Sequence, residues 1–136
     1  TNTTRYTYNG WHIISEIASI QNPQSPITNR YVWGMDLSGS LDGAGGIGGL
    51  LAQIRGTNAW LYTYDGNGNA VDLLQPSLLD IPPPVVAHYE YDPFGRLVFS
   101  SGPCASSNLW QCEIHLCLRL HIGWSTTYLS VAGSRW

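Results

Sequence analysis

The ten residues from Tyr89 to Val98 constrain the fold of this chain more than any other stretch. Residues 89–91 alternate aromatic and polar side chains as a strand does, and an apolar segment resumes at residue 97. Between them, Asp92-Pro93-Phe94-Gly95 is a turn signal, because Asp caps its own backbone, Pro presets φ and Gly accepts positive φ. The stretch therefore predicts two strands joined by a tight turn.

The same unit returns earlier in the chain. Tyr64-Asp65-Gly66-Asn67-Gly68-Asn69 repeats the order tyrosine, aspartate, glycine, and Tyr6-Thr7-Tyr8-Asn9-Gly10 is a weaker copy with asparagine for aspartate. A turn-centred unit that recurs along a chain is typical of a stacked β architecture.

Alternation with a period of two surrounds these turns and predicts strands. Trp60, Tyr62 and Tyr64 share one face of the first run, and residues 11–17 alternate in the same way. The run 85–91 divides into two faces, with Val85, Ala87, Tyr89 and Tyr91 on one and Val86, His88 and Glu90 on the other.

Three segments break the alternation. Residues 22–26 and the triple-proline segment 75–84 are predicted loops, because proline cannot donate to a strand ladder. The glycine tract 39–49 interrupts the pattern as well, and a weak helical signal covers Leu50 to Ile54. The chain is therefore expected to be a series of hairpins with loops between them.

These turns resemble the Rhs family of YD-repeat proteins, near the repeat-associated core of that family. The resemblance also rests on the segments 30–40 (Arg-Tyr-Val-Trp-Gly-Met-Asp-Leu-Ser-Gly-Ser) and 43–51 (Gly-Ala-Gly-Gly-Ile-Gly-Gly-Leu-Leu), and it extends from about residue 6 to residue 102. It implies a mainly β fold of antiparallel YD-type hairpins, forming an arc of a larger β-shell rather than a closed domain.

In that family many hairpins spiral into a shell that encloses a C-terminal toxin. The resemblance therefore implies a structural, non-catalytic segment whose tyrosine rows and turn aspartates stiffen a wall. Its partners would be the rest of a parent chain and that toxin, and the parent would be secreted or at the cell surface, while the location of this chain stays open. The residues assigned to wall-building turns are Tyr64, Asp65, Gly66, Tyr89, Tyr91, Asp92, Pro93, Gly95 and Arg96.

Two segments follow from the resemblance. Residues 1–102 form the family-like β segment, with 75–84 as a proline-rich connector, and 103–136 form a divergent tail. Residues 110–122 of that tail alternate like a long amphipathic strand, but the family carries a tyrosine-rich segment there. We hypothesise that the reading frame slips near residues 102–110, and a genuine divergent tail is the alternative. Because the chain starts at Thr1 and its only methionine is Met35, we expect it to be a piece of a longer product.

Composition excludes several partners. Only 11% of residues are charged, none is lysine and the net charge is −3, so no basic stripe exists to neutralise phosphates and no nucleic-acid partner is expected. No apolar run approaches the roughly 18 residues that span a bilayer, and the N-terminus lacks signal-peptide features. We expect no membrane span.

Two motifs suggest a cofactor or a metal. Gly43-Ala44-Gly45-Gly46-Ile47-Gly48 matches a dinucleotide fingerprint, but a polar, glycine-rich approach replaces the buried strand that such a site needs. Cys112, His115, Cys117 and His121 are a possible zinc set, but in an extended strand Cys112 faces away from the other three. We expect no cofactor and no metal, with a packed glycine connector and polar strand residues as the preferred interpretations.

No catalytic residues are expected, and the chain is predicted not to be an enzyme. Asp92-Pro93 is similar to the self-cleavage motif of the family, but the resemblance implies that this activity needs a later Asp-Pro-x-Gly region, which follows a Gly-Arg-Trp and which this sequence lacks. Glu90 and Asp92 share a strand face, yet they are too near a turn to raise one pKa as a glycosidase requires.

Two further expectations concern binding. Exposed Trp and Tyr side chains could stack on sugars, so a carbohydrate-binding or cell-surface interaction module is the alternative function. An isolated arc leaves strand edges unpaired, so self-association is expected.

Overall fold

The computed structural model describes residues 3–19 and 26–105, which form one eight-stranded sheet. The strands are β1 (Thr3–Asn9), β2 (His12–Ser19), β3 (Ile27–Trp33), β4 (Leu50–Arg55), β5 (Asn58–Tyr64), β6 (Ala70–Leu74), β7 (Val85–Tyr91) and β8 (Leu97–Ser101). Nothing in this part of the chain is helical.

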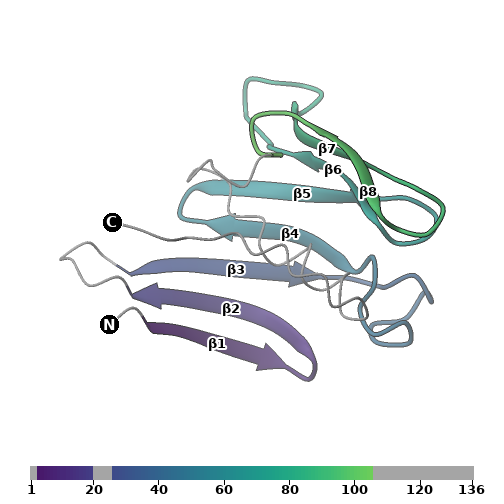
Figure 1. Ribbon diagram of the computed structural model, residues 1–136. Coiled ribbons are helices and arrows are strands. Elements are labelled where there is room, and N and C mark those ends of the chain that lie inside the picture. The colour runs from purple at the N-terminus through teal and green to yellow at the C-terminus, as the bar shows by residue number, and fades with distance from the viewer. Residues whose placement is uncertain (1–2, 20–25, 106–136) are drawn as a thin grey trace.

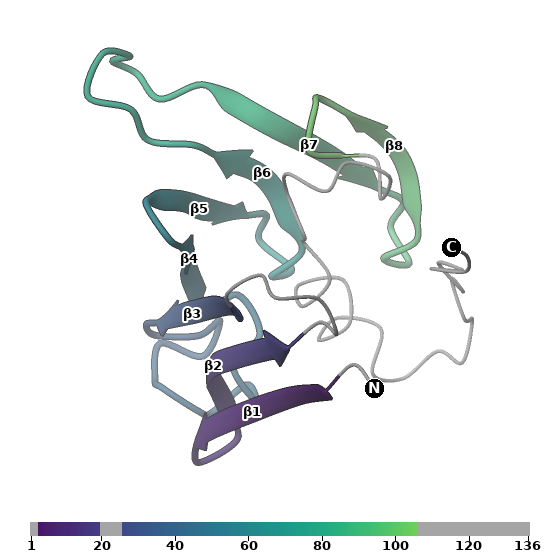
Figure 2. The ribbon, with the colours of Figure 1, turned by 90° about the vertical axis from the view of Figure 1, so that its left-hand side faces the viewer.

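The strands lie in the sheet in the same order as in the chain, and each pairs antiparallel with the next. The sheet is a meander of four hairpins, β1–β2, β3–β4, β5–β6 and β7–β8, whose turns all lie at one end of the strands (Figure 1). Figure 2 shows the strands following an arc from β1 to β8, and β1 does not pair with β8. The expected mainly β fold of antiparallel hairpins, open rather than closed, is confirmed.

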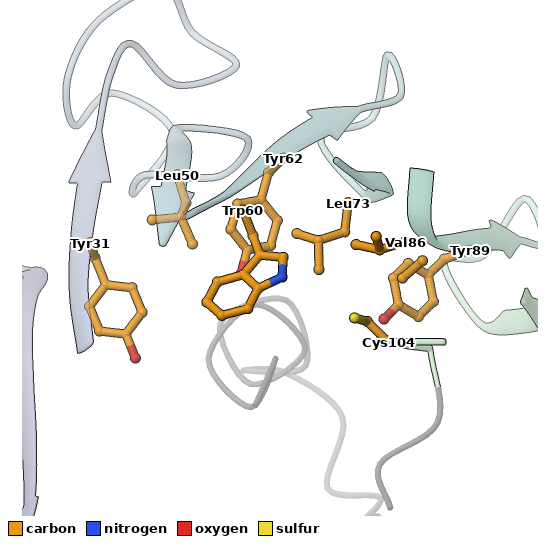
Figure 3. Close-up of a cluster of buried hydrophobic side chains, with 9 residues drawn as sticks. Tyr31, Leu50, Trp60, Tyr62, Leu73, Val86, Tyr89 and Cys104 are labelled. Carbon is orange, nitrogen blue, oxygen red and sulfur yellow. The ribbon is translucent and has the colours of Figure 1, made fainter. Parts of the chain in front are cut away.

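The buried side chains gather on one face of the sheet. Tyr31 pairs with Gln53 and Gln53 with Trp60, and residues directly opposite each other in a ladder share a face. The next row on that face is Tyr62, Leu73 and Ala87. Figure 3 shows the cluster that results, which consists of Tyr31, Leu50, Trp60, Tyr62, Leu73, Val86, Ala87, Tyr89 and Cys104.

The predicted alternation is confirmed along β5 and is wrong at the start of β7. Trp60 and Tyr62 are buried, and Tyr64 packs against the same cluster. In β7 the register shifts, because Leu73 pairs with Ala87 whereas Leu74 pairs with Val85. Val86 is therefore the extra residue of a bulge, which turns Val85 outward and leaves Val86 in the core.

The helical signal at Leu50–Ile54 is also wrong. These residues belong to β4, which pairs with β3 on one side and with β5 on the other. Pairing on both sides satisfies the backbone hydrogen bonds of β4, and this tertiary context outweighs a weak local propensity. The loop expected at 75–84 is confirmed, and the glycine tract 39–49, which interrupts the alternation, is a connection without strands, whereas residues 22–25 lie outside the described part.

Candidate functional site

The turn between β7 and β8 is held by the carboxylate of Asp92. Its Oδ1 accepts hydrogen bonds from the backbone N–H groups of Phe94 at 3.0 Å and Arg96 at 2.9 Å. The Asp92 N–H donates to the Arg96 carbonyl at 2.9 Å, and the Gly95 N–H donates to the Asp92 carbonyl at 2.9 Å. The aspartate thus satisfies the polar groups of a turn that Gly95 closes with a φ of 80°. Pro93 is the second residue of this turn.

The turn between β5 and β6 has the same arrangement around Asp65. Oδ1 accepts from the N–H groups of Asn67 at 2.9 Å and Asn69 at 2.8 Å, and the Asp65 N–H donates to the Asn69 carbonyl at 3.0 Å. Gly68 occupies the place of Gly95, because its N–H donates to the Asp65 carbonyl and its φ is 80°. Gly66, assigned from the sequence because it follows the aspartate, occupies the place of Pro93.

A third copy begins the long connection between β3 and β4. Oδ1 of Asp36 accepts from the Ser38 N–H at 2.9 Å, and the Asp36 N–H donates to the Ser40 carbonyl at 2.7 Å. The Gly39 N–H donates to the Asp36 carbonyl at 2.9 Å, and the φ of Gly39 is 76°. The site residues assigned from the sequence did not include this turn. A glycine three residues after an aspartate marks all three turns, at 36 and 39, 65 and 68, and 92 and 95. The same spacing also occurs at Asp42 and Gly45, where the Gly45 N–H donates to the Asp42 carbonyl at 3.0 Å.

The three turns differ in what the second carboxylate oxygen binds. Oδ2 of Asp92 accepts from Arg96 Nε at 3.1 Å, and Oδ2 of Asp65 accepts from Asn69 Nδ2 at 2.8 Å. Oδ2 of Asp36 instead accepts from the backbone N–H groups of Ala44 at 2.6 Å and Gly46 at 3.1 Å. The buried Asp36 carboxylate therefore holds the glycine tract against its own turn.

The glycine tract is a packed connector. A Cβ added to Gly46 would lie 2.6 Å from Nε2 of His12, and one added to Gly49 would lie 3.2 Å from two backbone oxygens. The tract leads into the antiparallel strand β4, whereas a dinucleotide fingerprint needs a helix N-terminus directed at the pyrophosphate. The described residues thus lack the element on which that fingerprint depends.

These hydrogen bonds keep two of the turn carboxylates ionised. The Ser38 hydroxyl, with the N–H groups of residues 44, 38 and 46, lowers the pKa of Asp36 to about 2. The backbone N–H groups of Arg96 and Phe94, together with the Arg96 guanidinium, lower the pKa of Asp92. Each hydrogen bond favours the charged form, so both carboxylates stay ionised to a lower pH than an ordinary aspartate does.

Each hairpin carries a bulge on the strand that leaves its turn. An aromatic residue near the end of the first strand pairs with the first bulge residue of the second strand. The residue that follows this first bulge residue has no partner in the ladder. The four pairs are Tyr8 with Ile13, Trp33 with Leu50, Tyr64 with Ala70, and Tyr91 with Leu97. Sequence periodicity alone did not reveal these bulges, because each shifts the alternation by one residue.

The aromatic residue of each later hairpin also binds the hairpin before it. Trp33 Nε1 donates to the Ile13 carbonyl at 2.8 Å, and the Tyr64 hydroxyl donates to the Leu50 carbonyl at 2.6 Å. The Tyr91 hydroxyl donates to the Ala70 carbonyl at 3.0 Å. The acceptor is in every case the first bulge residue of the preceding hairpin, so all three boundaries between hairpins carry one shared contact.

The register across these boundaries is shared as well. The residue two positions after the acceptor pairs with the residue three positions before the aromatic donor. These pairs are Ser15 with Arg30, Ala52 with Leu61, and Asp72 with His88. The hairpins therefore stack by one repeated geometry, although their side chains at these positions are unrelated in chemistry.

Other residues assigned from the sequence have distinct places. Tyr89 is buried in the core cluster, and Arg96 supplies the side chain that closes the Asp92 turn. Glu90 and Asp92 do not share a partner, since Oε1 of Glu90 lies 3.6 Å from His88 Nε2 whereas both Asp92 oxygens accept hydrogen bonds within the turn. Their arrangement supplies no acid and base pair.

His88 lies between two carboxylates on the face opposite the core. Its Nδ1 is 2.6 Å from Oδ1 of Asp72, with which it pairs across β6 and β7, and its Nε2 is 3.6 Å from Glu90. The hydrogen bond to Asp72 and the charges of both carboxylates raise the pKa of His88. Protonated His88 therefore stabilises the fold.

We expect the stability of the sheet to fall as pH rises above neutrality. Because the pKa of His88 is higher in the folded state, its contribution is complete below the ordinary value of 6.5 and disappears as pH passes the raised value. The lowered pKa values of Asp36 and Asp92 act in the opposite sense, because their contribution is complete above 3.8 and is lost as pH falls through the lowered value, which is about 2 for Asp36. The urea concentration at the unfolding midpoint should therefore be lower at about pH 9 than at about pH 6 in the wild type, and this difference should be smaller in His88→Gln. An equal change of the midpoint between these pH values in the two proteins would contradict the role assigned to His88.

Substitution of Gly95 by alanine separates backbone conformation from packing. A Cβ at Gly95 meets no atom within 4 Å, but its φ of 80° is in the left-handed region. We expect Gly95→Ala to lower the free energy of unfolding by about 1–2 kcal/mol. Gly66→Ala is the matched control, since that position is equally open and lacks a left-handed φ, and it should change stability by less than about 1 kcal/mol. Urea denaturation measures both, and equal losses would show that the left-handed conformation is not responsible.

In comparisons with known proteins, no family model and no curated protein matches this chain. Within residues 3–19 and 26–105, no three His, Cys, Asp or Glu side chains are grouped so as to hold a metal ion. The Cys112, His115, Cys117 and His121 set lies outside the described residues. In the part of the chain that the structure describes, no helix could cross a membrane.

Proposed function

We propose that this chain is a non-catalytic wall segment of an Rhs-type YD-repeat shell, which encloses a C-terminal effector of a parent protein. The observation that carries the proposal is the repeated boundary between hairpins, in which an aromatic donor binds the bulge carbonyl of the preceding hairpin. A wall of stacked hairpins needs a contact of this kind, which joins each hairpin to its neighbour. Because the acceptor is a backbone carbonyl, the contact does not require a particular side chain on the preceding hairpin.

The turns and the curvature support the same function. Three carboxylate-locked turns lie along one end of the sheet. The Asp65 and Asp92 turns lead directly into the following strand, and the Asp36 turn begins the connection to β4. The strands follow an arc in Figure 2, as a segment of a curved wall would. The carboxylates at Asp36, Asp65 and Asp92 each bind backbone N–H groups within these turns and connections.

Sequencing of the source DNA on both sides of the coding region, with translation of all frames, tests this proposal. We expect further hairpin units with an aspartate and a glycine three residues later, followed by a segment large enough to be an effector. In the parent protein, that segment should resist a protease until the shell is denatured. Flanking DNA without such units in any frame would contradict the proposal.

A sugar-binding surface is the second candidate, and one observation favours it. Among the described residues, the Trp and Tyr side chains from β3 to β7 are buried or half-buried, whereas Trp11 at the β1–β2 turn is 89% exposed. An exposed indole is a suitable surface for the apolar face of a sugar.

We expect any glycan that quenches tryptophan fluorescence to lose its effect in Trp11→Ala. Phe94→Ala is the control, because Phe94 is equally exposed at another turn and does not contribute indole fluorescence. Quenching that persists in Trp11→Ala, or no quenching across a glycan panel, would exclude Trp11 as a sugar site.

A further inference from the structure

Both edges of the described sheet present unpaired strands. Among the described strands, β1 pairs only with β2 and β8 pairs only with β7, and every residue of these two strands is exposed. Natural edge strands are usually protected by lysine, proline or an inward charge. β8 (Leu-Val-Phe-Ser-Ser) carries none of these, and the only charge on β1 is Arg5. These edges are therefore suited to pairing with another strand.

The two edges also carry the two halves of the boundary contact. Leu97 is the first bulge residue of the last hairpin, in the place of the acceptors Ile13, Leu50 and Ala70. Tyr8 is the aromatic residue of the first hairpin, in the place of the donors Trp33, Tyr64 and Tyr91. The Tyr8 ring is 56% exposed, and its hydroxyl has no hydrogen-bond partner among the described residues.

We propose that the β8 edge binds the β1 edge of a second copy of this chain, with the Tyr8 hydroxyl of one copy donating to the Leu97 carbonyl of the other. The direction is consistent, because β1 runs as β3, β5 and β7 do and would therefore lie antiparallel to β8. The contact joins different surfaces of the two copies, so it leaves one edge free on each and allows chains of copies to grow.

The proposal also fixes the register. At the three internal boundaries, the residue two after the acceptor pairs with the residue three before the donor. Applied to Leu97 and Tyr8, this rule places Phe99 of one copy opposite Arg5 of the other. The inference follows from the internal boundaries and does not depend on the proposed function.

The first experiment removes only the donor hydroxyl. Sedimentation velocity over a dilution series should show self-association of the wild type, and Tyr8→Phe should weaken it about three- to tenfold. Tyr6→Phe is the matched control, since Tyr6 is also exposed on β1 but is not at the donor position, and it should leave association unchanged. A wild type that remains monomeric throughout, or equal weakening by both variants, would overturn the proposal.

The second experiment tests the register and the pairing of unlike edges. Phe99→Lys places a like charge opposite Arg5 and should weaken association, whereas the double variant with Arg5→Glu restores an attractive pair and should recover it. An equimolar mixture of Phe99→Lys and Arg5→Glu should likewise associate more tightly than Phe99→Lys alone. Association that Arg5→Glu fails to rescue in either format would show that β8 pairs with another surface, and the proposal would fail.

Discussion

Asp36→Asn is expected to lower the thermal unfolding midpoint by on the order of 10 °C, the largest effect of any single turn substitution. The buried Asp36 carboxylate accepts hydrogen bonds from the Ser38 N–H and hydroxyl and from the N–H groups of Ala44 and Gly46. An amide of the same shape has one oxygen and one NH₂ group, so the NH₂ group would face donors and leave them unpaired. The substitution should therefore release the glycine tract as well as the turn.

Asp42→Asn is the control, because it removes the same charge from the same connection at an exposed side chain. Asp42 lies 3.4 Å from His12 and is 63% exposed, so its loss should shift the midpoint by only a small fraction of the Asp36→Asn effect. Differential scanning calorimetry measures both, with hydrogen exchange at the Ala44 and Gly46 amides as the local readout. Unchanged protection of these amides in Asp36→Asn would contradict the assigned role.

Leu73→Ala is expected to lower the free energy of unfolding by about 2–5 kcal/mol. Leu73 is only 1% exposed and lies in the middle of the core face, between Tyr62 on β5 and Ala87 on β7. Truncation removes apolar contacts and leaves a cavity, and the paired strands on both sides limit the collapse that would fill it.

Leu78→Ala is the matched control for this substitution. Leu78 lies in the 75–84 connector and is fully exposed, so the same chemical change should alter stability by less than about 0.5 kcal/mol. Chemical denaturation with urea distinguishes the two. A similar loss at both positions would mean that the core face does not supply the stability of the sheet.

The sequence predicted the turns better than it predicted the faces of the strands. Asp92 and Gly95 carry their turn in the expected way, because the conformation of a tight turn depends on the residues within it. Val85 and the segment 50–54 were assigned incorrectly, because a bulge and two neighbouring strands decide their environment. Such effects come from residues distant in the chain, which local alternation does not contain.

The candidate site was predicted only in part, for a similar reason. Asp65 was identified, but its glycine partner is Gly68, since the position of the left-handed residue depends on the hydrogen-bond pattern and not on adjacency to the aspartate. Tyr64 and Tyr91 were assigned to wall building, yet their acceptors at Leu50 and Ala70 could not be deduced. Those carbonyls become accessible only at bulges, which appear once the hairpins are paired.

The boundary contact has a consequence for how such chains can change over time. The connection between the second and third hairpins is the short turn at residues 56–57, whereas the third and fourth are joined by the long segment 75–84. Both boundaries nevertheless have a tyrosine donor and a bulge-carbonyl acceptor at equivalent positions, and the same register between the paired strands. Connector length and unit docking are thus uncoupled, so whole hairpins could be inserted, deleted or exchanged by recombination at the connectors while the neighbouring units continue to fit.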